Sequence, residues 1–83
     1  MDVLKYPLST EKAIRMIESD NVITFVVDMK ASRSKIKKEI QEKFNVLVKK
    51  ISISITPKGK KKAYIKLMDD HPAIDIATRL GLM

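Results

Sequence analysis

The 83-residue sequence contains no cysteine, one histidine and only two glycines. Without cysteine there can be no disulfide, thiolate nucleophile or cysteine-ligated zinc, and the lone His71 leaves no histidine pair for a metal site or proton relay. Two glycines are too few for a phosphate-binding loop of the P-loop or dinucleotide type. We therefore expect neither an enzyme nor a metal or cofactor site.

Long hydrophobic runs are also missing. The longest nearly apolar stretch, residues 22–27, has six residues, whereas a helix needs about 20 to cross a bilayer. The N-terminus lacks the basic flank and apolar run of a signal peptide. Because 45% of the residues are hydrophobic, a core can form. We expect one soluble, intracellular domain over residues 1–83 that is monomeric when isolated and has no membrane span.

The positive charge is concentrated in the middle of the chain. The whole sequence has a net charge of +7, from 17 basic and 10 acidic residues. Between Lys30 and Lys66, thirteen basic residues stand against two acidic ones, which gives +11, and the rest of the chain carries −4. Such asymmetry indicates one surface that faces a polyanion and a second surface turned elsewhere.

Apolar residues at helical spacing predict three helices. The first runs over residues 10–19 and is capped by Ser9 or Thr10, and the second runs from its cap Ser32 to about residue 44. The last follows Pro72 and stops at Gly81. The residues expected to point inward are Ala13, Ile14 and Ile17 in the first helix, Ile36, Ile40 and Phe44 in the second, and Ile74, Ala77 and Leu80 in the third.

Alternating and β-branched runs predict the strands. Residues 21–28 are apolar on both faces, which is typical of a central strand. Strand pattern resumes near residue 46, where Ile51, Ile53 and Ile55 mark one apolar face, and the turn at 57–60 leads into a strand at 62–67. A short edge strand at 3–6 is a further possibility. The order helix-strand-helix-strand-strand-helix predicts an α+β two-layer sandwich, with a small antiparallel sheet of three or four strands and helices packed on it.

Two clusters of cations are candidate phosphate contacts. Lys58, Lys60, Lys61 and Lys62 crowd the hairpin tip, where they repel one another unless an anion is near; a merely solubilising loop is the alternative. Arg33, Lys35, Lys37 and Lys38 crowd the start of the second helix, where the helix dipole favours acids and a bound phosphate would reverse the balance.

The aromatic residues predict contact with RNA shape and backbone, not a stacking platform. Phe25 and Phe44 fall in apolar stripes and are expected in the core, which leaves Tyr6 and Tyr64 as the exposable rings. The strand around Tyr64 lacks the paired aromatics of an RNA-recognition motif.

Residues 6–13 (YPLSTEKA) resemble the P-x-S/T-E-K opening of the universal large-subunit ribosomal protein twenty-three family. Further segments resemble this family in the same order along nearly the whole chain. They are residues 25–27, 31–37, 44–46, 57–65 and 73–81. The short hairpin tip and the ending are similar to the archaeal form.

The resemblance implies a cytoplasmic, ribosome-associated, non-enzymatic part of the large ribosomal subunit at the rim of the polypeptide exit tunnel. Its partners would be large-subunit ribosomal RNA, mostly the third domain, neighbouring ribosomal proteins, and the signal recognition particle or other exit-site factors. The expected RNA-binding residues are Lys5, Tyr6, Pro7, Thr10, Lys12, Arg33, Lys35, Lys37, Lys38, Lys58, Lys60, Lys61, Lys62 and Tyr64.

Glu11 matches the factor-docking acid of the family's opening motif, and equally it is a first-turn acid that suits the helix dipole. The sequence departs from the family in two places. It has only a short turn where bacterial relatives carry a long hairpin extension, so direct contact with the nascent chain is not expected. Lys35 stands where a capping-box acid is common, which shifts that helix end toward phosphate binding.

Three other interpretations stay open at this point. One is a small basic chromatin or general RNA-binding protein, and another is a protein-interaction module whose lysines are merely solvated. The third is a small acid-phosphate hydrolase.

Overall fold

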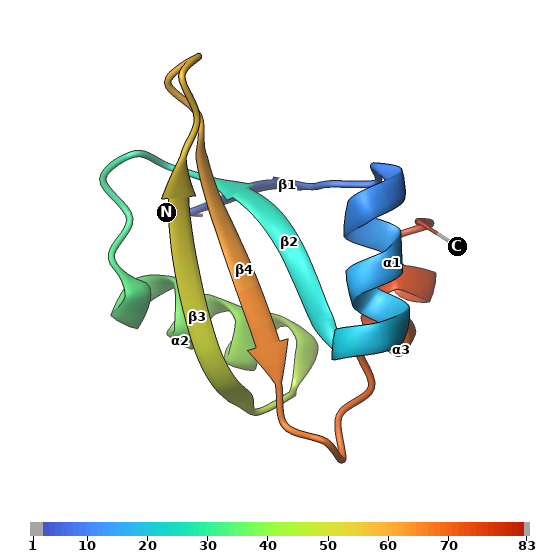
Figure 1. The fold of residues 1–83 in the computed structure, drawn as a ribbon. Coiled ribbons are helices and arrows are strands. Elements are labelled where there is room, and N and C mark those ends of the chain that lie inside the picture. The colour runs from blue at the N-terminus through green and yellow to red at the C-terminus, as the bar shows by residue number, and fades with distance from the viewer. Residues whose placement is uncertain (1–2, 83) are drawn as a thin grey trace.

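The four strands form one antiparallel sheet. In the computed structural model, which describes residues 3–82, they are β1 (Leu4–Pro7), β2 (Val22–Val27), β3 (Val48–Ile55) and β4 (Lys61–Leu67), and they lie in the order β1-β2-β4-β3 (Figure 1). β2 is buried along its whole length, which confirms the expected central strand. The short N-terminal edge strand is also present, one residue later than expected.

Three helices complete the predicted element order. They are α1 (Glu11–Asp20), α2 (Arg33–Phe44) and α3 (Ala73–Arg79). The Thr10 hydroxyl caps α1 by accepting from the amide of Ala13 at 3.2 Å, and the Ser32 hydroxyl caps α2 by accepting from the amide of Lys35 at 3.3 Å. In Figure 1, α2 lies behind β3 and β4, and α1 stands beside β2 with α3 behind it. The predicted α+β fold is therefore confirmed.

The core lies between the sheet and the helices. Ile36 and Ile40 of α2 are fully buried, and the rings of Phe25 and Phe44 meet at a centroid distance of 6.3 Å, as their apolar stripes predicted. Burying one such side chain contributes about 1.5–3 kcal/mol. Leu80 and Leu82 at the end of the chain pack against this core, and Met83 lies outside the described residues.

The inward face of α3 differs from the prediction in one residue. Ile74 is 44% exposed, whereas Ile76 is 1% exposed and takes the expected place in the core. The buried side chains of α3 are those of Ala73, Ile76 and Ala77, spaced by three and four positions. The prediction was wrong at Ile74 because contacts with other parts of the chain determine how this short helix is rotated about its axis.

Asn21 fixes that rotation. It ends α1 in the left-handed conformation, with φ of 56°, so β2 begins one residue later than expected. Its side-chain oxygen accepts from the amide of Ala73 at 2.6 Å, and its Nδ2 donates to the carbonyls of Leu67, Met68 and His71 at 3.2–3.3 Å. One side chain therefore joins α1, the end of β4 and the start of α3.

β3 departs from the expected strand at both ends. It begins at Val48, not near residue 46, and the amide of Val48 donates to the Gln41 side chain of α2 at 3.1 Å. Ile51 and Ile53 are half-buried against the core, but Ile55 is 60% exposed, so the predicted apolar face does not continue to the end of the strand. The hairpin projects past the helices there (Figure 1). Its turn is closed by Gly59, which has a φ of 80° and donates to the Thr56 carbonyl.

Candidate nucleic-acid interface

The register of the sheet gathers basic and aromatic side chains on one face. Residues paired across antiparallel strands point to the same side. Lys66 pairs with both Val22 and Lys50, and Tyr64 pairs with both Thr24 and Ser52. Because the alternate residues of β4 are in the core, these side chains lie on the opposite side of the sheet. We call this side the open face and define it by Tyr6, Lys50, Ser52, Ser54, Lys62, Tyr64 and Lys66.

Lys60 and Tyr6 extend the open face to the hairpin. The Nζ of Lys60 donates to the hydroxyl of Tyr6 at 3.1 Å and lies 5.8 Å from the centre of its ring. Together the two distances place the ammonium beyond the hydroxyl and near the plane of the ring, so the contact is a hydrogen bond and not a cation over the ring face. The contact joins the hairpin tip to β1.

Lys61 points to the other side of the sheet. Its Nζ donates to the carbonyls of Ala31 at 2.6 Å and Met29 at 3.3 Å, in the loop before α2. These two bonds satisfy loop carbonyls, so Lys61 braces the hairpin against that loop. Lys58 stays exposed at the tip.

A hollow of about 400 Å³ opens between the open face and α1. Lys12 and Met16, one turn apart on α1, line its helix side. Lys66 also lines the hollow, and its Nζ donates to the carbonyl of Asp20 at 2.9 Å, at the end of α1 where the helix dipole is negative. The complete lining is Lys12, Met16, Val22, Lys50, Ser52, Tyr64 and Lys66.

A smaller hollow of about 90 Å³ adjoins the first one and shares Lys12, Met16 and Tyr64 with it. Thr10 and Thr24 also line it. The hydroxyl of Thr24 is the buried side-chain polar atom of the described residues that lacks a hydrogen-bond partner, and Thr24 is only 2% exposed. An unsatisfied buried hydroxyl costs about 1–3 kcal/mol.

A third hollow, of about 220 Å³, continues the basic surface around the edge of β3 onto α2. Arg33 and Lys37 line it from the helix, and Lys49 and Lys50 line it from the strand. Because Lys50 lines both this hollow and the one beside α1, the cations form a continuous band. No aspartate or glutamate is among the described residues that line the three hollows.

Lys35 and Lys38 do not join this band. Gln41 marks the side of α2 that faces β3, and the carboxylate of Glu39 marks the side that faces β1, where it accepts from the amides of residues 3 and 4 at 3.0 and 2.9 Å. At about 100° per residue, Lys37 lies on the Gln41 side, Lys35 lies on the Glu39 side, and Lys38 points outward.

The structure thus divides the predicted RNA-binding residues into two groups. The first group belongs to the basic band. Tyr6, Lys60, Lys62 and Tyr64 lie on the open face, Thr10 and Lys12 flank it at α1, and Arg33 and Lys37 lie at the edge near α2. Lys35, Lys38 and Lys61 point away from the band, and Lys5, Pro7 and Lys58 line none of its hollows.

Sequence reasoning missed Lys49, Lys50 and Lys66 as candidate contacts. A partial signal was present, because Lys50 alternates with the polar serines of β3 and Lys66 alternates with Tyr64. The strand register that sets Lys50 beside Lys66 was not readable from the sequence.

Glu11 stands between Thr10 and Lys12 at the start of α1, but it does not line the hollows of the basic band. Its side chain is 90% exposed and forms an ion pair with Arg15, one turn along α1, at 3.3 Å. Exposed pairs of this kind contribute little to stability, about 0.3–0.5 kcal/mol. Glu11 is therefore accessible to a partner.

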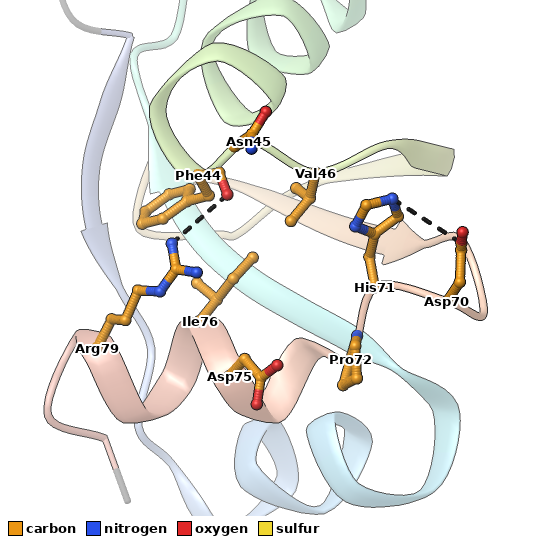
Figure 2. A pocket seen from close by; sticks show the side chains of 9 residues that line it. All are labelled: Phe44, Asn45, Val46, Asp70, His71, Pro72, Asp75, Ile76 and Arg79. Atoms are coloured by element: carbon orange, nitrogen blue, oxygen red, sulfur yellow. Dashed lines mark hydrogen bonds and ion pairs between the residues drawn. The ribbon is translucent and has the colours of Figure 1, made fainter.

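A fourth hollow, of about 150 Å³, lies between α3 and the end of α2 (Figure 2). Arg79 donates to the carbonyl of Phe44 at 3.5 Å, where a cation suits the end of a helix. His71 lies 3.8 Å from a carboxylate oxygen of Asp70. Figure 2 shows Asp70 and Asp75 around this hollow together with His71 and Arg79, so carboxylates are present here, unlike in the hollows of the band.

Within residues 3–82, no group of three or more His, Cys, Asp or Glu side chains is placed to hold a metal ion. No helix in this part of the chain has the length and apolar character needed to cross a bilayer.

The chain is similar to known proteins both by family and by sequence. A family model described as "Ribosomal protein L23" matches residues 2–76. The chain is also similar to the curated "Large ribosomal subunit protein uL23" of Methanococcus aeolicus, with 46% identity over 81 residues, which cover 98% of this chain and 94% of the relative.

Proposed function

From the premise that the chain belongs to the ribosomal protein L23 family, we propose that it is a structural component of the large ribosomal subunit that binds large-subunit rRNA. The protein acts as one rRNA-binding domain over residues 1–83, located with the ribosome in the cytoplasm. Its role is structural and not catalytic. It contacts RNA through the continuous band of cations on the open face and the adjoining edge of α2.

The band carries this proposal because its chemistry suits a phosphate backbone. Eight cations lie on it, and no carboxylate of the described residues lines its hollows to oppose them. The eight are Lys12, Arg33, Lys37, Lys49, Lys50, Lys60, Lys62 and Lys66. If each contacts one phosphate, counterion release gives a slope of roughly −6 to −7 in a plot of log affinity against log salt.

The experiment measures binding of the full chain to a large-subunit rRNA fragment, to an unrelated RNA duplex and to mixed DNA at several salt concentrations. We expect preference for the rRNA fragment at moderate salt, on top of a steep salt dependence. Equal affinity for all three nucleic acids would instead favour a general RNA or chromatin protein. No binding to any of them would favour a protein-interaction module.

The exposed position of Glu11 supports a second part of the proposal. We propose that the protein lies near the polypeptide exit tunnel and helps to form a docking site for nascent-chain factors such as the signal recognition particle. The side chains of Glu11 and of Asp70, beside α3, are exposed and line none of the hollows of the band, so they can face a factor. Glu11→Lys should weaken factor binding to assembled large subunits and leave rRNA binding unchanged. Unchanged factor binding would remove Glu11 from the docking site.

A further inference from the structure

The hollow beside α1 differs in character from the rest of the basic band. Its floor is apolar and comes from Met16, Val22 and the half-buried ring of Tyr64, whereas Lys12, Lys50 and Lys66 stand around it. A phosphate backbone alone needs the cations but no apolar floor. The floor therefore indicates that something other than phosphate enters the hollow.

We propose that this hollow receives one unstacked nucleobase of the bound RNA, with Tyr64 as its stacking partner. This inference rests on the proposed function. Splayed bases of RNA loops and bulges are commonly stacked on aromatic side chains, and every base has a π-face to offer. The occupant is a nucleotide because its base matches the apolar floor and its flanking phosphates match the three lysines.

The dimensions of the hollow fit this occupant. Its volume of about 400 Å³ lies at the lower end of the range for small-molecule sites, roughly 300–1,000 Å³. Tyr64 is paired in the sheet with Thr24 and Ser52, whose side chains are short. Met16 offers a flexible thioether that adapts to an aromatic partner.

The adjoining hollow of about 90 Å³ is too small for a base but has room for water, at roughly 30 Å³ per molecule. Tyr64 lines both hollows, so a nucleotide stacked on it lies next to this water-sized space. The Thr24 hydroxyl has almost no accessible surface, so it does not contact the nucleotide directly.

The test measures binding of full-length Tyr64→Ala, Tyr64→Leu and Tyr64→Phe to large-subunit rRNA over a salt series. Loss of one stacked base weakens affinity by roughly 5- to 150-fold at every salt concentration. The salt slope stays the same because no charge is removed. Tyr64→Phe keeps the ring and should bind within about twofold of the unmodified protein. Tyr64→Leu keeps apolar bulk without a π-face, and it should lose affinity even if Tyr64→Ala destabilises the sheet.

Lys50→Ala is the matched control on the rim of the same hollow. It should reduce the magnitude of the salt slope by about 1, whereas the Tyr64 variants should not. If Tyr64→Leu binds rRNA as tightly as the unmodified protein, no base is stacked on the ring, and the inference is wrong while rRNA binding stands.

A direct probe separates this inference from the proposed function. An RNA hairpin with a single unpaired 2-aminopurine reports stacking as a loss of its fluorescence. The unmodified protein should quench this probe, and Tyr64→Leu should not. Absence of quenching by the unmodified protein overturns the inference. A lack of preference for large-subunit rRNA overturns the proposed function, whatever the probe shows.

Discussion

Lys37 and Lys38 are neighbours in sequence whose roles should differ. Lys37 lines the hollow shared by α2 and β3, together with Lys49 and Lys50, whereas Lys38 points outward from α2. Changing either one to alanine removes one positive charge from an exposed position of the same helix. The two variants therefore have equal net charge and similar helix propensity, and they differ only in where the charge was placed.

The size of the effect follows from one lost phosphate contact. Each contact contributes about 0.7–0.9 to the slope of log affinity against log salt. At 1 M salt the lost contact contributes nothing to the affinity on this scale. Compared with the unmodified protein at the same salt concentration, Lys37→Ala should therefore bind rRNA roughly five- to eightfold more weakly at 0.1 M and three- to fourfold more weakly at 0.2 M. Lys38→Ala should stay within about twofold of the unmodified protein at both concentrations, because it removes only distant, screened charge.

Fluorescence anisotropy with a labelled large-subunit rRNA fragment, repeated at several salt concentrations, measures both quantities. Thermal unfolding of the two variants serves as the stability control, since exposed substitutions of this kind change stability by no more than about 0.5 kcal/mol. Equal loss of affinity in the two variants, or a larger loss for Lys38→Ala, would refute the assignment of the contact surface to the band of cations.

Three further predictions concern the stability of the free protein. Asn21→Ala should lower the free energy of unfolding, measured in urea, by about 2 kcal/mol more than Asn45→Ala does. Both residues are left-handed helix caps, but within residues 3–82 only the Asn21 side chain forms hydrogen bonds. Equal losses in the two variants would contradict the role of Asn21 in joining α1, β4 and α3. Thr24→Val should stabilise the fold by about 1 kcal/mol by removing the unpartnered hydroxyl, and a destabilised variant would show that this hydroxyl is satisfied in solution. Lys35→Glu should raise stability by about 0.3–1 kcal/mol, because a carboxylate at this position completes the capping box with Ser32 and suits the helix dipole. Lys35 lies outside the band, so this variant should keep most of its rRNA affinity. A large loss of affinity would show that the RNA interface extends around the start of α2.

Much of the fold was predictable because its signals are local. The run of β2 is apolar on both faces, short and rich in β-branched residues, which is typical of a strand covered on both sides. The spacing of Ile36, Ile40 and Phe44 fixed the inward face of α2, and Ser32 marked its start. Each of these signals is carried by residues that are close together in the sequence.

The sequence-based predictions were wrong where a group distant in sequence determines which side chains are buried. The side chain of Asn21 bonds to the first amide of α3, 52 positions away in sequence, so Ile76 and not Ile74 faces the core. Ile55 belongs by alternation to an apolar face, but the helix layer ends before reaching it. Periodicity records which residues share a side, and it does not record what covers that side.

The candidate site shows the same division. The sequence by itself determined that the middle of the chain is strongly basic, at +11, and that Tyr64 and the hairpin lysines lie on a polar alternation. Only the tertiary structure decided that Lys50 and Lys66 meet Lys12 of α1 around an apolar floor, and that Lys38 and Lys61 point elsewhere. The physical reason is that charge and periodicity are properties of a segment, whereas strand register and helix rotation are set by the packing of the whole core.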